Sequence, residues 1–156
     1  MQEWPVNRGY ENFVAMIDCQ SFQSAIGQLE TSLHYLHSEA SRADSGLRRQ
    51  FRAAVIQAFE FTYDLAIRMI LRQLGEIHPR PAELREMSFM DLMRTAARAG
   101  LIREAPPFKA YRELRNLTSH SYDESNAERV LASVEFFLQE IQFLLSELQR
   151  RNRAAD

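Results

Sequence analysis

Apolar residues recur along most of this chain at steps of three and four positions, which is the spacing of one face of an α-helix. Over residues 20–39 the recurring residues are Phe22, Ile26, Leu29, Leu33 and Leu36. A second, longer helix is predicted from about residue 47 to residue 74, with Gly75 as its C-terminal cap. The small polar residues at 38–46 predict a loop between these two helices.

Two further helices are predicted in the middle of the chain. The hydroxyl of Ser88 can cap the start of a short helix, and Gly100 suits the backbone conformation that ends one. The next helix is predicted to begin at the prolines at 106 and 107, because the first turn of a helix tolerates proline. It is predicted to end near His120, where a dense polar segment begins.

The last predicted helix covers about residues 126–149, and its apolar stripe is broad enough to face more than one neighbour. Ser125 and Glu128 have the spacing of a capping box at its start. The arginine-rich residues 150–156 are expected to fray. Residues 1–18 show no clear periodicity, so their structure stays open.

These patterns predict an all-α fold, an antiparallel up-and-down bundle of four main helices plus a short helix. The 156 residues are enough for one hydrophobic core and too few for two comfortable ones. The bundle is therefore expected to occupy residues 19–149 as one domain. With 46% hydrophobic and 26% charged residues, a disordered chain is excluded.

The charge balance argues against a general affinity for nucleic acid or membranes. Nineteen Lys and Arg stand against 21 Asp and Glu, for a formal net charge of −2, so any site for an anion must be local. The single cysteine, Cys19, excludes an internal disulfide and a multi-cysteine zinc site. No apolar run approaches the roughly 20 residues of a membrane span. We therefore expect a cytoplasmic protein without a membrane partner.

Several familiar kinds of site are absent from the sequence or weak in it. There is no glycine-rich phosphate loop and no Gly-x-Ser-x-Gly elbow, which excludes nucleotide-loop and α/β-hydrolase chemistry. His34 and His37 stand three apart on one helix and could share a metal, but no third ligand stands near them. His78 lies in a proline-rich loop, where a solvated side chain is the ordinary interpretation. No metal site is predicted.

The densest polar segment lies at the end of the fourth predicted helix, which begins at residue 106. It contains Arg115, Asn116, Thr118, Ser119 and His120. Asn116 and His120 lie on one helical face, whereas Arg115 and His120 are about 140° apart around the axis of a regular helix. Arg115 and His120 can therefore meet only if the helix breaks by His120 or if a second subunit completes the site.

These residue types would suit the handling of a phosphodiester. In a cleavage without metal, His120 would move the proton, Arg115 would stabilise the pentavalent transition state, and Asn116, Thr118 or Ser119 would orient phosphate oxygens. Such a site could bind or cleave RNA. The alternative is a helix end whose arginine and histidine only satisfy the carbonyls of the last turn.

A second polar run, residues 59–66, sets Glu60 and Asp64 on one face of the long helix. Three interpretations stay open. Asp64 could pair with Arg68 within the helix, the two carboxylates could bind metal or act in acid-base catalysis, or one of them could reach Arg115 or another cation across the bundle and hold the polar site in place.

The two runs together resemble the nucleotidyltransferase substrate-binding protein family, part of the larger HEPN group. The residues that carry the resemblance are Phe-Glu-Phe-Thr-Tyr-Asp-Leu-Ala at 59–66 and Arg-Asn-Leu-Thr-Ser-His-Ser-Tyr at 115–122, and it extends over about residues 20–149. It implies an antiparallel helical bundle, usually a homodimer. It also implies a gene beside that of a minimal nucleotidyltransferase, and a complex with that enzyme.

The resemblance also implies roles for three residues. In HEPN toxins an Arg-x4-His pair is the active site of a metal-independent endoribonuclease, and here it matches Arg115 and His120. In some relatives the nucleotidyltransferase attaches AMP to a tyrosine two residues past the histidine and so silences the toxin; here this position is Tyr122.

The expected function is that of the partner and substrate-binding subunit of a nucleotidyltransferase in a toxin-antitoxin-like module, with Tyr122 as AMP acceptor. The alternative is a ribonuclease toxin that cuts RNA with Arg115 and His120. No cofactor is expected in this chain, because ATP would be used by the partner.

Overall fold

The computed structural model describes residues 16–120 and 123–156, and at His120 it describes the backbone alone. Within these residues the fold is all-α, as predicted. The helices are α1 (Gln20–Leu36), α2 (Glu39–Ala43), α3 (Ser45–Ile77), the 3-10 helix η1 (Pro81–Arg85), α4 (Phe89–Arg98), α5 (Pro106–His120) and α6 (Glu124–Ala155).

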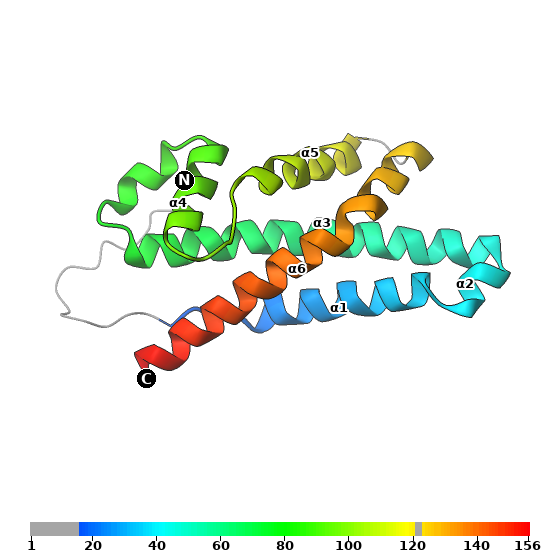
Figure 1. Cartoon of the computed structure of the whole chain (residues 1–156), viewed down its shortest axis with the longest axis horizontal. Coiled ribbons are helices and arrows are strands. Elements are labelled where there is room, and N and C mark those ends of the chain that lie inside the picture. Colours follow the sequence, from blue (N-terminus) through cyan, green and yellow to red (C-terminus); the bar gives the residue numbers. More distant parts are fainter. Residues whose placement is uncertain (1–15, 121–122) are drawn as a thin grey trace.

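The four main helices are α1, α3, α5 and α6, and they form the predicted up-and-down bundle. Successive main helices run in opposite directions, and α6 crosses α1 and α3 obliquely (Figure 1). The long helix α3 contacts each of the other three. The short helix α4 packs against α5 and lies near the C-terminal end of α3 (Figure 1).

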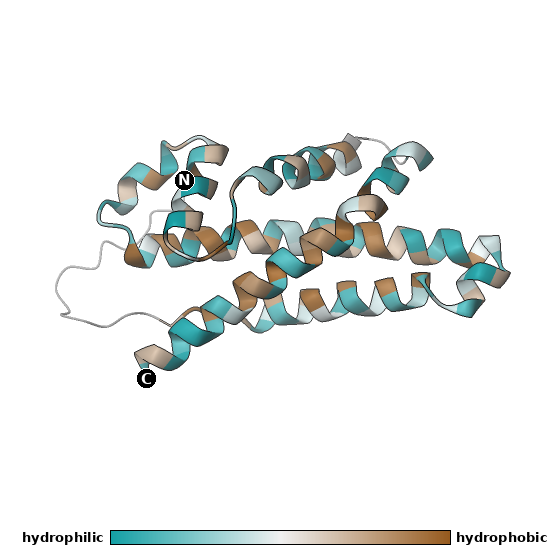
Figure 2. Cartoon of the chain, viewed as in Figure 1, coloured by the Kyte–Doolittle hydropathy of each residue, from teal (hydrophilic) through white to brown (hydrophobic). Residues whose placement is uncertain are grey.

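The core is continuous between the main helices. The apolar stripes of α1, α3 and α6 face one another, while their polar residues face outward (Figure 2). All six residues of the stripe predicted on the last helix are buried: Val130, Val134, Phe137, Ile141, Leu144 and Leu148. That stripe faces α1, α3 and α5, which explains its breadth.

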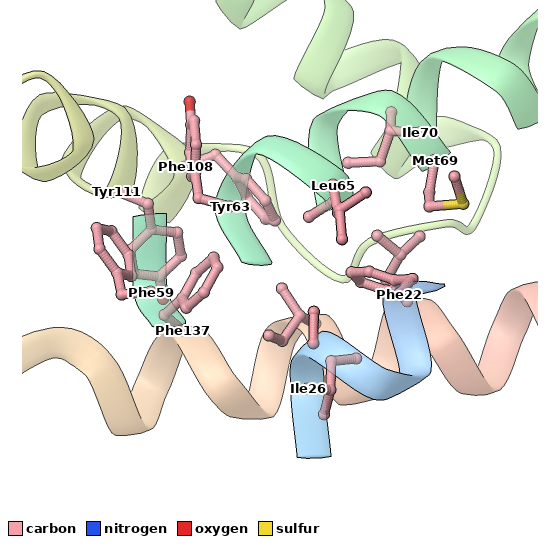
Figure 3. Packing of buried hydrophobic residues seen from close by; sticks show 14 of the residues in the cluster. Phe22, Ile26, Phe59, Tyr63, Leu65, Met69, Ile70, Phe108, Tyr111 and Phe137 are labelled. Atoms are coloured by element: carbon pink, nitrogen blue, oxygen red, sulfur yellow. The ribbon is translucent and has the colours of Figure 1, made fainter. Parts of the chain in front are cut away.

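Four aromatic side chains from three helices form the centre of the core (Figure 3). The ring of Phe137 lies 4.9 Å from that of Phe59 and 5.2 Å from that of Tyr111, both edge-to-face, and 6.4 Å from that of Tyr63. Aromatic pairs in this geometry contribute about 0.5–1.5 kcal/mol each beyond the burial of their area. The cluster fixes α5 against α3 and α6.

The short helix α4 has both of its predicted ends. The Ser88 hydroxyl accepts a hydrogen bond from the Asp91 amide at 3.1 Å. At the other end Gly100 has φ +78°, and the amides of Gly100 and Leu101 donate to the carbonyls of Ala97 and Ala96. These two bonds form a Schellman motif, which buries Leu101 completely.

The helix boundaries differ from the prediction around α3. The predicted loop at 38–46 contains the short helix α2, capped by the Ser38 hydroxyl. Gly75 lies inside α3 and does not cap it, because the helix continues to Ile77 and ends at His78, whose backbone is extended. A glycine alone does not end a helix when the residues after it can still make helical hydrogen bonds.

The start of α6 also differs from the predicted capping box. Asp123 is the N-cap and accepts a hydrogen bond from the Ser125 amide at 2.9 Å. Aspartate caps a helix as well as serine does, so the helix begins earlier than about residue 126. Glu128 does not reach back to the helix start and instead approaches Arg52, with Oε1 3.0 Å from its Nη1.

The C-terminal end of α6 is ordered further than expected. Residues 150–155 continue the helix, whereas the sequence predicts fraying. Asn152 explains the difference, because its side-chain amide accepts from the Ile17 amide at 3.0 Å and donates to the Ile17 carbonyl at 2.7 Å. Ile17 is itself buried, so the packed body exceeds the predicted 19–149 at both ends.

None of the helices over residues 16–120 and 123–156 is long and apolar enough to cross a membrane.

Candidate functional site

The candidate site lies where the middle of α3 meets the last turns of α5. Arg115 on α5 reaches across to two carboxylates on α3. Its Nε and Nη2 donate to Oδ1 and Oδ2 of Asp64, each at 3.0 Å, and its Nη1 donates to Oε2 of Glu60 at 3.1 Å. The contact that the sequence suggested between the two polar runs is therefore present.

The aromatic core places these groups. Tyr63 on α3 and Tyr111 on α5 are buried and pack against Phe137. Asp64 follows Tyr63 directly, and Arg115 lies one turn after Tyr111, so both polar side chains emerge beside the packed rings. The core thus fixes how far apart α3 and α5 lie where Arg115 meets Asp64.

Two hydroxyls tighten the end of α5 around Arg115. The Thr118 hydroxyl donates to the Arg115 carbonyl at 2.9 Å, and the Ser119 hydroxyl donates to the same carbonyl at 3.1 Å. Ser119 also accepts a hydrogen bond from Nη1 of Arg115 at 2.7 Å. These bonds hold the guanidinium and the last turn together, so both hydroxyls already have partners within the chain.

The ion-pair cluster is only partly screened from water. The exposed fractions of the side chains are 22% for Arg115, 31% for Glu60 and 43% for Asp64. The hydrogen bonds to Asp64, more than any other effect, raise the pKa of the Arg115 guanidinium, so this side chain stays charged. Burial raises the pKa of the neighbouring Tyr63 phenol to about 12, so it stays neutral.

A shallow groove of about 450 Å³ runs beside this cluster, between α3, α4 and α5. Its lining includes Asp64, Arg68, Phe89, Arg112, Asn116 and Ser119. Asp64 uses both oxygens on Arg115, and the intrahelical pair with Arg68 that the sequence allowed does not form. The contribution of Phe89 is not visible in the sequence, where it is only the first residue of a short helix.

The other predicted site residues have separate outcomes. Asn116 is exposed and lines the groove, and α5 ends at His120 as expected. The His120 side chain and the whole of Tyr122 lie outside the described residues. The meeting of His120 with Arg115 and the role of Tyr122 therefore stay predictions.

The remaining histidines have ordinary surroundings. His37 Nε2 lies 3.2 Å from a carboxylate oxygen of Glu135, and His34 packs edge-on against Tyr35. His78 Nδ1 accepts a hydrogen bond from the Arg80 amide at 3.1 Å. Across residues 16–119 and 123–156, no three His, Cys, Asp or Glu side chains converge in a way that could hold a metal ion.

Comparisons with known proteins agree on the family. Residues 17–150 match the family described as nucleotidyltransferase substrate binding protein like. A curated protein of Haemophilus influenzae named probable ribonuclease HepT is 42% identical over 101 residues, which are 65% of this chain and 69% of that protein.

A solved structure from Haemophilus influenzae has the same fold, with a TM-score of 0.77 and 33% sequence identity. The match covers 85% of this chain and 99% of that one, which is described as the substrate-binding domain of a nucleotidyltransferase. The resemblance carried by residues 59–66 and 115–122 is thereby confirmed, and the chain belongs to the nucleotidyltransferase substrate-binding protein family.

Proposed function

We propose that this chain is the partner and substrate-binding subunit of a nucleotidyltransferase in a two-component, toxin-antitoxin-like module, with Tyr122 as the group that receives AMP. The observation that carries the proposal is the family match over residues 17–150. The similar solved structure, described as the substrate-binding domain of a nucleotidyltransferase, supports the same role.

The chemistry of the transfer is simple in this proposal. The phenol oxygen of Tyr122 attacks the α-phosphorus of ATP, pyrophosphate leaves, and the phenol proton passes to solvent or to a base of the partner. Tyr122 follows the end of α5 by two residues and precedes Asp123, the N-cap of α6.

The test incubates the purified chain with the nucleotidyltransferase that the family resemblance implies as its partner and with ATP and Mg²⁺, and then measures intact mass. We expect the mass of one adenylyl group to be added to the wild type and not to Tyr122→Phe. Tyr35→Phe is the matched control, because Tyr35 is an exposed tyrosine on α1. Equal modification of Tyr122→Phe and wild type would rule out this acceptor.

A second candidate function is metal-independent cleavage of RNA by Arg115 and His120. The arrangement of Arg115 favours it, because two carboxylates and the Ser119 hydroxyl hold its guanidinium in one orientation at the end of α5. The relative named probable ribonuclease HepT supports it as well. The two functions are compatible, since modification of Tyr122 would control a neighbouring active site.

In this second function His120 removes the proton from a ribose 2′-hydroxyl, whose oxygen attacks the adjacent phosphorus. The 5′-oxygen of the next nucleotide leaves and takes up a proton, and Arg115 stabilises the charge on the phosphoryl oxygens meanwhile. Because α5 is helical up to His120, positions 115 and 120 differ by about 140° around its axis. This separation supports a homodimer in which a second copy completes the site.

The cleavage test uses unmodified protein, verified by intact mass, with RNA and an excess of chelator. We expect the wild type to cut RNA, and His120→Ala and Arg115→Ala to leave it intact. Wild-type protein that leaves every tested RNA intact would remove the second function. It would not affect the first, which the mass measurement on Tyr122 decides.

A further inference from the structure

The groove between α3, α4 and α5 combines an aromatic face with a stacked guanidinium. The Arg112 guanidinium lies over the ring of Phe89, with its central carbon 4.6 Å from the ring centroid. Phe89 is half-buried and Arg112 is exposed, so the ring is partly packed and the arginine side chain is accessible to solvent. Nucleic-acid bases stack on guanidinium planes and on aromatic rings in this way.

The charged side chains in the groove lining that form no ion pair are positive. Arg68 and Arg112 line it, are exposed, and form no ion pair with any residue of 16–119 or 123–156. The one carboxylate in the lining is Asp64, and both of its oxygens bind Arg115. An anionic ligand would therefore meet two free guanidinium groups without having to displace an ion pair.

Arginines at two other sites in the described structure offer a comparison with those of the groove. The hollow between α1, α2, α3 and α6 also contains arginines, but Arg42 donates to the His37 carbonyl and Arg48 pairs with Glu128. Arg103 also lies over an aromatic ring, that of Phe143, but it pairs with Glu140 at 2.9 Å. Arg48 and Arg103 therefore have carboxylate partners within the chain, whereas Arg42 contacts a neutral carbonyl oxygen.

The position of the groove links it to the candidate site. Asp64, Arg115 and Ser119 belong both to its lining and to the ion-pair cluster. A chain of nucleotides that places one phosphate at the end of α5 would therefore extend along Asn116 and Arg112 towards Phe89. Successive phosphates of a single strand are a few ångströms apart, and the two arginines stand on neighbouring helices across the groove.

We propose that this groove binds single-stranded RNA next to the phosphate to be cleaved. One base stacks on the Arg112 guanidinium over Phe89, while Arg68 and the N–H groups of Arg112 contact the flanking phosphates. A duplex would not fit this role, because its bases are stacked on one another and their faces are not free. The inference deepens the ribonuclease function proposed above and rests on it.

The experiment measures binding by fluorescence anisotropy, with a labelled single-stranded RNA whose riboses carry 2′-O-methyl groups and so cannot be cut. The variants are Arg68→Gln, Arg112→Gln and Phe89→Leu, and leucine keeps the apolar packing of Phe89. Arg49→Gln is the matched control, since Arg49 is an exposed arginine on the same helix as Arg68 and about 28 Å from it at 1.5 Å per residue.

We expect Arg112→Gln to weaken binding at least about fivefold, the lower end of what the loss of one base stack costs. Phe89→Leu should weaken binding as well, because the guanidinium loses the ring beneath it. Each arginine variant should reduce the slope of log affinity against log salt by about 0.7, the value for one contact to a single-stranded phosphate. Arg49→Gln should bind as the wild type does. A base-paired RNA of the same length should bind more weakly and without dependence on Phe89.

Three results would overturn the proposal: unchanged binding by all three groove variants, an equal loss in Arg49→Gln, or equal binding of duplex RNA with the same dependence on Phe89. The outcome is separate from that of the cleavage test. If the wild type cuts RNA and the groove variants bind and cut like it, the groove proposal fails and the ribonuclease function stands. If the wild type binds RNA through the groove but cuts none, RNA binding by the groove stands and the ribonuclease function fails.

Discussion

Asp64 binds Arg115 through both of its carboxylate oxygens, one on Nε and one on Nη2, each at 3.0 Å. Such a fork contact fixes the plane of the guanidinium as well as its position. Lysine could not replace the arginine here, because an ammonium group makes no bidentate contact. The arrangement suits a side chain that must keep one orientation at the end of α5.

The first prediction concerns the strength of this pair. A double-mutant cycle with Asp64→Asn and Arg115→Gln should give a coupling of about 1 kcal/mol, because the geometry is bidentate but both groups are partly solvated. The measurement is urea unfolding of the four proteins. If the destabilisation of the double variant equals the sum of the two single destabilisations to within about 0.3 kcal/mol, the pair has no energetic role.

A second prediction concerns alkaline pH. The Tyr63 phenol has its pKa raised by burial from 10.0 to about 12, so the unfolded chain loses this proton at lower pH than the folded one. Its contribution to stability is complete below pH 10 and is lost as the pH rises towards 12. Relative to Tyr63→Phe, the wild type should lose about 1 kcal/mol by pH 11 and about 2–3 kcal/mol near pH 12.

Urea unfolding of wild type and Tyr63→Phe between pH 8 and pH 12 checks this prediction. Other groups also titrate in this range, but they are common to both proteins and cancel in the difference. Stability curves that stay parallel over the whole range would contradict the predicted effect of burial on Tyr63.

A third prediction compares two arginines that contact the same carboxylate. Arg52 and Arg48 both approach Oε1 of Glu128, at 3.0 and 3.4 Å, but their side chains are 4% and 44% exposed. Arg52→Met should lower the free energy of unfolding by about 1–3 kcal/mol, and Arg48→Met by no more than about 0.5 kcal/mol. The difference follows from the burial of Arg52 and from its second carboxylate contact, to Glu124.

Hydrogen exchange locates the effect of these two variants. Amides in the first two turns of α6 should exchange faster in Arg52→Met, because Arg52 also contacts Glu124 in the first turn, at 3.3 Å. Arg48→Met should leave this exchange unchanged. Equal exchange in the two variants would mean that Arg52 does not hold the start of α6 against α3.

A fourth prediction uses two glycines with opposite expectations. Gly27 lies within α1, and a Cβ there would meet no atom within 4 Å, so Gly27→Ala should stabilise by about 0.5–1 kcal/mol. Gly100 has φ +78°, so Gly100→Ala should destabilise by about 1–2 kcal/mol. The melting temperatures should therefore move in opposite directions, and a shift of both in one direction would contradict this reading of the backbone.

Much of the fold could be predicted from the sequence because apolar spacing follows directly from helix geometry. The stripe from Val130 to Leu148 is buried along its whole length, and the ends of α4 at Ser88 and Gly100 are where the capping residues place them. Such signals involve neighbouring residues and need no knowledge of the rest of the chain.

The errors have two different causes. Glycine often follows the last turn of a helix, which predicted a helix end at Gly75, but α3 continues past it. Residues 150–155 look like a fraying tail, but Asn152 is held by Ile17, 135 positions earlier in the chain. The first outcome depends on the residues that directly follow Gly75, and the second depends on a residue far away in the chain.

Part of the candidate site could be predicted from the sequence. The matching charges on residues 60, 64 and 115 suggested a contact that the structure contains. The groove could not be predicted from the sequence. It requires Phe89 on one helix to approach Arg112 on another, and 22 residues separate them in the chain. The number of residues between them says nothing about the angle at which α4 meets α5.

The pair of hydrogen bonds between Ile17 and Asn152 has a consequence for how the protein is made. The ribosome synthesises Ile17 long before Asn152. The side chain of Asn152 can bind the Ile17 backbone only after residue 152 has left the exit tunnel. These two hydrogen bonds can therefore form only after α6 has been synthesised and has emerged. A nascent chain stalled before Asn152 should still expose Ile17 to a protease that full-length protein resists, so docking of this end reports that synthesis has passed α6.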